Sequence, residues 1–124
     1  IKVIGTLRTF PIRVSNRDGS SGPHYPDQVE LKWEDIGLNA ELTTVTKLPR
    51  RIFSFSQTQL QEALWHCGGY WDTRLFLNFA NYVTDKALLD EMIAVIASPT
   101  KMNMNSPKVA WIGNGPDDKD VVAR

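Results

Sequence analysis

The chain has 124 residues, of which 42% are hydrophobic and 23% are charged, so it can form one modest globular domain but not two. Its 14 lysines and arginines balance 14 aspartates and glutamates, so no global field draws it to nucleic acid or to a membrane surface. No apolar run is long enough to cross a membrane, and no signal-peptide pattern is present. The single Cys67 excludes an internal disulfide, suits a reducing cytosol and, with only two histidines, argues against a zinc cage.

Strand patterns rich in apolar and β-branched residues occupy residues 1–10, 52–55, 74–83 and 109–112. One short helical turn is expected over residues 31–37, where a glycine closes it. The remaining periodic segments predict helices between the strands. Strand, helix, strand, helix, strand is an α/β order, in which ligand-binding loops gather at the carboxyl ends of strands.

Two amphipathic helices are predicted, over residues 57–67 and 85–97. Ser56 is a suitable N-cap for the first helix, in a capping-box pattern with Gln59, and Thr84 is the expected N-cap for the second. Both helices should cover the sheet with one apolar face. The residues expected to face the core are Leu60, Ala63, Leu64 and Cys67 in the first helix, and Leu88, Leu89, Met92, Ile93 and Ile96 in the second.

Three segments at predicted strand ends are candidates for a shared ligand cleft. They are the glycine-, serine- and proline-rich loop that begins at Arg13, the polar residue Asn78, and the tight loop Gly113-Asn-Gly-Pro116. A buried amide must find partners, so Asn78 either forms a local turn or binds a ligand. The long loop after Arg13 is either functional or a flexible insertion.

The stretch 41–51, Glu-Leu-Thr-Thr-Val-Thr-Lys-Leu-Pro-Arg-Arg, combines threonines, a lysine and two adjacent arginines. The planar guanidinium of arginine matches a carboxylate or phosphate in two-point fashion, and threonine hydroxyls add further donors. This composition predicts a loop that binds an anion. An ordinary solvated basic turn is the alternative.

The order and spacing of several motifs resemble the carboxyl-terminal part of the adenylosuccinate synthetase family. These motifs are Gly22-Pro-x-x-Pro26, Thr44-x-Thr-x-x-Pro-Arg-Arg51, the strand at 75–83, and Ile112-Gly-Asn-Gly-Pro-Asp117. The stretches 21–28 and 41–51 are more similar to the bacteriophage branch, whose members are deoxyguanylate–aspartate ligases that make the precursor of 2-aminoadenine for modified phage DNA. Each motif is weak alone, and the specificity lies in their order.

This resemblance implies a fold related to the P-loop NTPases, an α/β mixed sheet flanked by helices. It implies that residues 1–124 are a single carboxyl-terminal segment of a longer synthetase, expected to be a homodimer in the cytoplasm of a host cell. In such enzymes a nucleoside triphosphate phosphorylates the 6-oxygen of a purine nucleotide, and the aspartate amine then displaces the phosphate. The expected substrates are dGMP, L-aspartate and ATP or dATP, with Mg²⁺ bound by the missing amino-terminal part.

The resemblance assigns binding residues to this chain but no catalytic residue and no metal ligand. We expect no turnover by the chain alone, because no Gly-x-x-x-x-Gly-Lys phosphate loop occurs in it. The resemblance implies that Thr44, Val45, Thr46, Lys47 and Arg50 bind aspartate. It implies that Arg13, Val14 and Leu48 bind the substrate nucleotide. Binding of the triphosphate falls on Arg50, Asn78, Gly113, Asn114, Gly115 and Pro116.

Two departures from the cellular enzymes refine these expectations. Lys47-Leu48 stands where those enzymes have Gly-Arg, which places an apolar side chain near the sugar and favours a deoxynucleotide. Phe76-Leu-Asn78 stands where they have Lys-x-Asp. An asparagine amide donates and accepts, as the adenine edge requires, whereas an aspartate accepts from both N–H groups of guanine.

Two alternatives remain open from the sequence. Instead of part of a phage ligase, the chain could be a piece of a cellular, GTP-dependent synthetase that acts on IMP, or a non-catalytic binding module on the same scaffold. Asn78 argues against the cellular enzyme, and the start at Ile1 without an initiator methionine indicates a piece of a longer protein.

Overall fold

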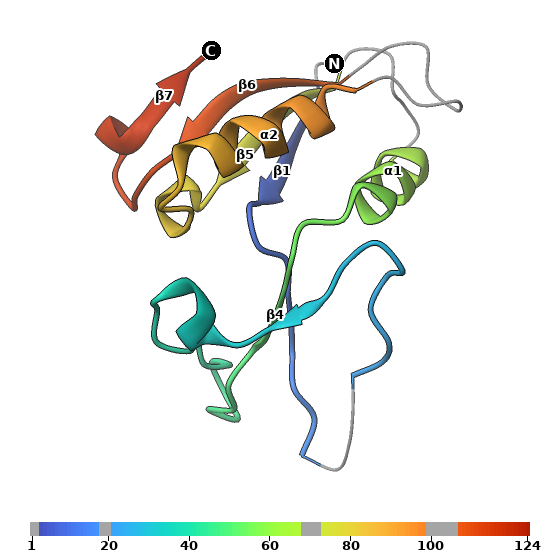
Figure 1. Cartoon of the computed structure of the whole chain (residues 1–124), viewed down its shortest axis with the longest axis vertical. Coiled ribbons are helices and arrows are strands. Elements are labelled where there is room, and N and C mark those ends of the chain that lie inside the picture. Colours follow the sequence, from blue (N-terminus) through green and yellow to red (C-terminus); the bar gives the residue numbers. More distant parts are fainter. Residues whose placement is uncertain (1–2, 18–20, 68–72, 99–106) are drawn as a thin grey trace.

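The computed structural model describes residues 3–17, 21–67, 73–98 and 107–124, which form two sheets and two α-helices (Figure 1). Figure 1 shows the four-stranded sheet with both helices in one part of the molecule and the three-stranded sheet in the other. Within these ranges no helix combines the length and the apolar character needed to span a bilayer.

The four-stranded sheet has the order β1-β5-β6-β7. Its strands are β1 (Ile4–Arg8), β5 (Arg74–Asn78), β6 (Lys108–Gly113) and β7 (Val121–Ala123). The first three strands are parallel and β7 pairs antiparallel with β6, so the sheet is mixed. The predicted α/β class with a mixed sheet is therefore confirmed.

The second sheet is antiparallel, with the order β2-β4-β3. Its strands are β2 (Ile12–Arg13), β4 (Arg51–Phe53) and β3 (Glu30–Leu31). A 3₁₀ turn over Trp33–Ile36 follows β3 and ends at a left-handed glycine, which confirms the predicted helical turn. The strand predicted over residues 52–55 corresponds to β4, but the sequence patterns did not reveal β2 or β3, because two-residue strands carry almost no periodic signal.

The two helices are α1 (Gln57–His66) and α2 (Lys86–Ile96), close to the predicted ranges. Leu60 and Leu64 of α1 are buried, but Ala63 and Cys67 are exposed, so the prediction that they face the core is wrong. Helix α1 buries only a stripe at i and i+4, and Cys67 is its C-cap residue, beyond the last packed turn.

In α2 the predicted residues Met92, Ile93 and Ile96 are buried, and Leu89 packs against them. Leu88 is 45% exposed, so its predicted place in the core is wrong. A helix that covers one face of a sheet turns only part of its circumference inward, and Leu88 lies at the edge of that face.

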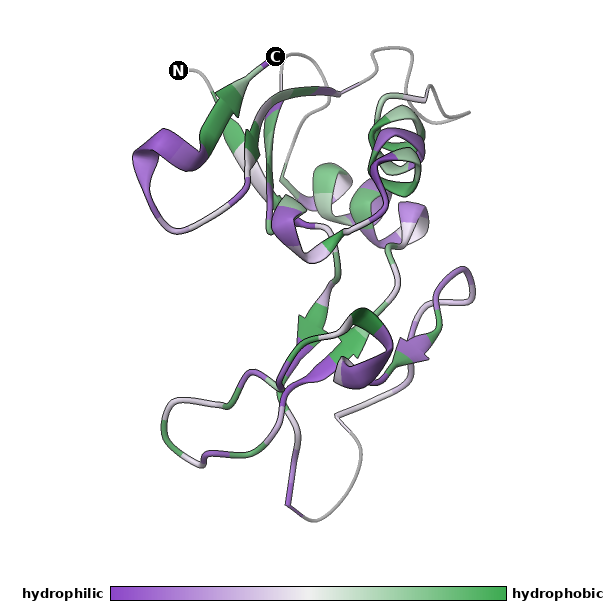
Figure 2. Ribbon diagram, turned by 60° about the vertical axis from the view of Figure 1, so that its left-hand side comes forward, coloured by the Kyte–Doolittle hydropathy of each residue, from purple (hydrophilic) through white to green (hydrophobic). Residues whose placement is uncertain are grey.

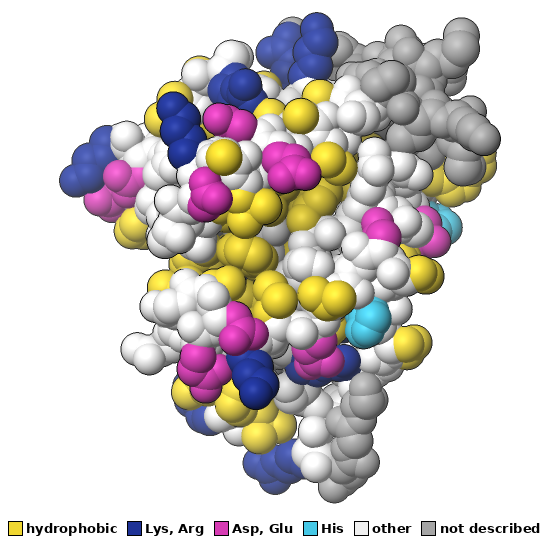
Figure 3. Space-filling model, viewed as in Figure 1, with side chains coloured by type: hydrophobic (Ala, Val, Ile, Leu, Met, Phe, Trp, Pro, Cys, Tyr) yellow, Lys and Arg dark blue, Asp and Glu magenta, His cyan; other side chains and the backbone are white. Residues whose placement is uncertain are grey.

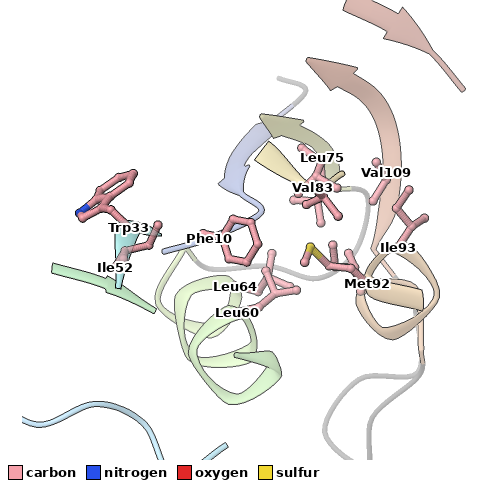
Figure 4. Packing of buried hydrophobic residues seen from close by; sticks show 12 residues of the cluster. Phe10, Trp33, Ile52, Leu60, Leu64, Leu75, Val83, Met92, Ile93 and Val109 are labelled. Carbon is pink, nitrogen blue, oxygen red and sulfur yellow. The ribbon is translucent and has the colours of Figure 1, made fainter. Parts of the chain in front are cut away.

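One hydrophobic core joins the two parts of the molecule. Figure 4 shows Phe10 between the pair Trp33 and Ile52 on one side and the α1 leucines Leu60 and Leu64 on the other. Figure 2 shows hydrophobic residues on the strands where the parts meet, with hydrophilic residues in the turn before β7. Hydrophobic side chains also run across the middle of the face in Figure 3.

The strand predicted over residues 74–83 ends early, at Asn78. Phe79 adopts a left-handed conformation with φ of 61°, and Ala80–Tyr82 form a 3₁₀ turn. The Thr9 hydroxyl donates a hydrogen bond of 2.7 Å to the Phe79 carbonyl, which holds the turn. A non-glycine residue in this conformation costs energy, so these contacts must fix it. The apolar composition of residues 79–83 concealed the break.

The predicted N-cap of α2 is wrong by one residue. Asp85, not Thr84, is the cap, and its carboxylate accepts a hydrogen bond of 2.9 Å from the Ala87 N–H. A carboxylate at this position also interacts favourably with the helix dipole. The Ser56 cap of α1 is confirmed, because its hydroxyl accepts from the Gln59 N–H at 3.0 Å.

Replacing Asp85 with alanine should lower the free energy of unfolding by about 1 kcal/mol, because it removes the side-chain acceptor of a helix N–H. Replacing Thr84 with alanine should change it by less than about 0.5 kcal/mol, since Thr84 lies outside the cap. Urea unfolding of both variants, followed by circular dichroism, distinguishes the two positions. A larger loss in the Thr84 variant would contradict the assigned cap.

Candidate functional site

Asn78 lies at the carboxyl end of β5, directly opposite Arg8 at the end of β1. Side chains alternate along β5, so Leu75 and Leu77 enter the core while Phe76 and Asn78 point to the other face. Within the described part of the chain, no hydrogen bond involves the Asn78 side-chain amide. The amide is half-buried and therefore available to a ligand at this strand end.

Gly113, the last residue of β6, lies against this amide. A Cβ atom at position 113 would lie 2.7 Å from the Asn78 Oδ1 and 3.2 Å from two ring carbons of Phe76. Any side chain here would displace one of the two, so only glycine lets the β6 backbone approach them this closely. The predicted neighbours Asn78 and Gly113 are thus brought together.

The loop Gly113-Asn-Gly-Pro116 is closed by Asp120. The Asp120 carbonyl accepts a hydrogen bond of 2.9 Å from the Asn114 N–H, and its carboxylate accepts one of 3.1 Å from the Asp117 N–H. Gly115 approaches the same carboxylate too closely for any side chain. Asn114 and Pro116 remain exposed on the loop. Sequence reasoning missed Asp120, although its spacing from Asp117 fits a reciprocal capping pattern.

The predicted anion-binding stretch forms a hairpin whose base is a bridge between Leu42 and Pro49. Buried Thr43 organises the tip: its hydroxyl accepts from the Leu48 N–H at 3.0 Å and shares a hydrogen bond of 2.5 Å with the Thr46 hydroxyl. Lys47 is left-handed, with φ of 55°. The tip residues Thr44, Val45, Thr46 and Lys47 are all exposed, with Val45 at 89%.

Arg50 is held by its backbone on both sides. Its N–H donates to the Glu41 carbonyl at 2.7 Å, and its own carbonyl accepts from the Trp33 indole at 2.8 Å. The Nε of its half-buried side chain is buried and has no hydrogen-bond partner among the described residues. A buried donor without an acceptor costs about 1–3 kcal/mol, so this Nε is an unsatisfied group in the described part of the chain.

A cluster around Glu41 connects the hairpin to the strand ends. The Glu41 Oε1 accepts a hydrogen bond of 2.6 Å from the Arg8 guanidinium and one of 2.9 Å from the Tyr82 hydroxyl. The guanidinium of Arg8 also stacks 3.8 Å above the Phe79 ring. Burial, followed by the hydrogen bond to Glu41, raises the pKa of the Tyr82 hydroxyl, so Tyr82 is a donor at neutral pH.

Arg13 lies on β2 of the second sheet, not in the loop where the sequence placed it. Its guanidinium stacks 5.4 Å from the Phe53 ring centre and donates to the Pro23 carbonyl. No contact among the described residues joins Arg13 to Asn78 or to Gly113, so of the three expected parts only Asn78 and the Gly113 loop are in direct contact.

The segment just after Arg13 does reach the hairpin. The Ser15 hydroxyl donates a hydrogen bond of 2.5 Å to the Pro49 carbonyl. This contact places exposed Val14 and half-buried Leu48, both expected near the substrate nucleotide, on neighbouring segments. Sequence reasoning offered no signal for it, because a serine hydroxyl and a proline carbonyl carry no recognisable pattern.

No model of a protein family matches the chain. Among curated proteins, it is 46% identical over 123 residues to the N6-succino-2-amino-2'-deoxyadenylate synthase of Vibrio phage phiVC8, covering 99% of this chain and 34% of that protein. It is 50% identical over 104 residues to the enzyme of the same name from Acinetobacter phage SH-Ab 15497, covering 78% of this chain and 26% of that protein.

A solved structure is also similar. The succinoaminodeoxyadenylate synthetase of cyanophage S-2L, bound to dGMP and dATP as an energy donor, superposes with a TM-score of 0.83 at 43% identity. The match covers 98% of this chain and 33% of that one. The chain thus spans about a third of the length of the curated relatives it matches. Sequence and fold together identify it as a homologue of the phage N6-succino-2-amino-2'-deoxyadenylate synthases.

Proposed function

We propose that this chain supplies the aspartate-binding hairpin and the triphosphate-base pocket of a succinoaminodeoxyadenylate synthase. In the reaction, ATP or dATP phosphorylates the 6-oxygen of dGMP and the amine of L-aspartate displaces that phosphate, which gives 2-amino-N6-succinyl-dAMP, ADP or dADP, and phosphate. The main support is the Asn78 amide, which is packed against Gly113 without a hydrogen-bond partner in the described residues, in a chain 43% identical to a synthetase solved with dATP.

On this proposal Arg50 binds a carboxylate of aspartate. Its backbone is held by hydrogen bonds on both sides, and a guanidinium can bind a carboxylate in a charge-assisted, two-point contact. The exposed hydroxyls of Thr44 and Thr46 and the Lys47 ammonium lie on the same hairpin tip and add donors for the second carboxylate. Aspartate carries two carboxylates, so one hairpin with several donors is a suitable receptor.

Asn78 reads the base of the triphosphate. Its amide pairs in two-point fashion with the adenine edge, while the Gly113 backbone and the Phe76 ring define the space beside it. Leu48 would face the sugar of the other nucleotide, where an apolar side chain leaves a 2'-hydroxyl unpaired and favours a deoxynucleotide. This combination favours ATP over GTP as the triphosphate, and a deoxynucleotide over a ribonucleotide as the other substrate.

This chain contributes binding and orientation in the proposed reaction. Its 124 residues contain no Gly-x-x-x-x-Gly-Lys phosphate loop, and among the described residues no group of three or more His, Cys, Asp or Glu side chains could hold a metal ion. We therefore assign phosphoryl transfer, and any Mg²⁺ it requires, to other parts of a full-length enzyme. No step proposed for these residues passes through a metal.

Replacing Asn78 with aspartate in the full-length enzyme should shift kcat/KM from ATP towards GTP. A carboxylate only accepts, so it loses the adenine N1 contact and gains the two N–H donors of guanine, a change of about 1–3 kcal/mol. Asn81→Asp is the matched control, since it adds the same charge at an exposed position three residues away. An unaltered ATP preference in the Asn78 variant would show that the base is read elsewhere.

Replacing Arg50 with alanine should lower kcat/KM for aspartate at least roughly 30-fold, because it removes the charged partner of a carboxylate. This factor corresponds to a loss of about 2–5 kcal/mol of binding free energy in the transition state. Steady-state kinetics with varied aspartate provide the measurement. Arg74→Ala is the control, because it removes an equal charge from an exposed side chain at the opposite end of β5 from Asn78. Unchanged aspartate kinetics in the Arg50 variant would refute the assignment.

A further inference from the structure

We propose that Glu41 is a positioning residue that couples the aspartate hairpin to the strand end bearing Asn78. This inference rests on the proposed function and adds to it a communication between the two binding sites. Neither Glu41 nor its partners Arg8 and Tyr82 belongs to the residues assigned to ligand binding above. All three contact one another where the hairpin meets the four-stranded sheet.

The side chain of Glu41 is attached to the sheet. A single carboxylate oxygen, Oε1, accepts hydrogen bonds from both Arg8 and Tyr82. The Arg8 and Glu41 side chains are only 22% and 25% exposed, so solvent screens this ion pair less than an ordinary surface pair. Arg8 is itself fixed, because it lies over the Phe79 ring and its Nε donates to the Phe10 carbonyl at 3.3 Å.

The backbone of Glu41 is attached to the hairpin. Its carbonyl accepts the 2.7 Å hydrogen bond from the Arg50 N–H at the hairpin base. One residue therefore holds Arg50 through its main chain and the sheet through its side chain. Through this residue, a displacement of the Arg8–Glu41 pair can be passed to the peptide that fixes Arg50.

The sheet side of the link reaches Asn78 without a gap. Arg8 stands opposite Asn78 in the β1–β5 register, and the next residue, Thr9, donates its N–H to the Asn78 carbonyl at 3.2 Å. Thr9 is fully buried, and its hydroxyl holds Phe79 in the left-handed turn. On this proposal, a ligand that fixes the backbone at Asn78 also favours one position of Arg8, of Glu41 and, through the Glu41 carbonyl, of Arg50.

The expected consequence is positive cooperativity between the triphosphate and aspartate. If each ligand favours the same arrangement of this cluster, each raises the affinity of the other by the same factor. The glutamine variant Glu41→Gln keeps the size of the side chain and an accepting oxygen but loses the charge that both donors share. It should loosen the link without removing a group that contacts either ligand.

The test uses the full-length enzyme with Glu41→Gln, and Glu62→Gln as the matched control. Glu62 of α1 also accepts a tyrosine hydroxyl, that of Tyr25 at 2.8 Å, but it lies outside the hairpin and the strand ends. In the Glu41 variant the KM for aspartate should rise about tenfold while kcat stays within about twofold. Calorimetry gives the factor by which a non-hydrolysable ATP analogue raises the affinity for aspartate. This factor should be smaller in the Glu41 variant and unchanged in the control.

Two further variants separate the possible failures. Tyr82→Phe removes one donor to Glu41 but keeps the ion pair with Arg8, so it should raise the aspartate KM about threefold. This variant tests the proposal even if the Glu41 variant does not fold. Tyr25→Phe is its control. The proposed role of Glu41 would be overturned if Glu41→Gln or Tyr82→Phe had the wild-type aspartate KM and the wild-type response to the ATP analogue. If Arg50→Ala still raised the aspartate KM, the proposed function would stand. An unchanged KM in Arg50→Ala would overturn the proposed function itself.

Discussion

The burial of the short link between the two sheets is the constraint on which the rest of this structure depends. The chain leaves β1 at Arg8, passes through Thr9 and Phe10, and enters β2 at Ile12. Thr9 is fully buried and Phe10 is 6% exposed, so this link lies in the core and is not a hinge on the surface. Because it is fixed, the hairpin of one part and the strand ends of the other keep a defined relationship.

The two candidate binding regions are built differently, and this difference suits their proposed ligands. Asn78 and Gly113 lie at the ends of the neighbouring strands β5 and β6. Asn78 pairs with Arg8 of β1 and Gly113 pairs with Val121 of β7, so the backbone of each is held by an adjacent strand and a flat base requires little adjustment. The hairpin is held at its base, around Glu41 and Arg50, while its tip, which is closed by the hydrogen bonds of Thr43, is exposed. A small, flexible, doubly charged ligand such as aspartate can be surrounded by such a tip after the base is in place.

The sequence predicted what depends on local periodicity and missed what depends on contacts across the chain. Helices α1 and α2 and the core positions Ile93 and Ile96 followed from spacing alone. The early end of β5 did not, because Phe79 is held in its turn by Thr9, 70 residues away. Arg8, Glu41 and Tyr82 are each ordinary polar residues in the sequence, and only folding gathers them. The ligand roles of Arg50 and Asn78 stay predictions.

The parallel register of β1 and β5 limits how this region can change in length. Arg8 and Asn78 are paired in this register, so their side chains lie on the same face of the sheet, and successive side chains of each strand point to opposite faces. This placement brings Arg8 to Glu41. One inserted or deleted residue in β1 would turn Arg8 to the other face and separate it from Glu41, and one in β5 would turn Asn78 in the same way. A substitution in this region changes the contacts of one side chain. A change of one residue in strand length would instead disrupt the Glu41 cluster, the left-handed turn at Phe79 and the strand end at Asn78 together.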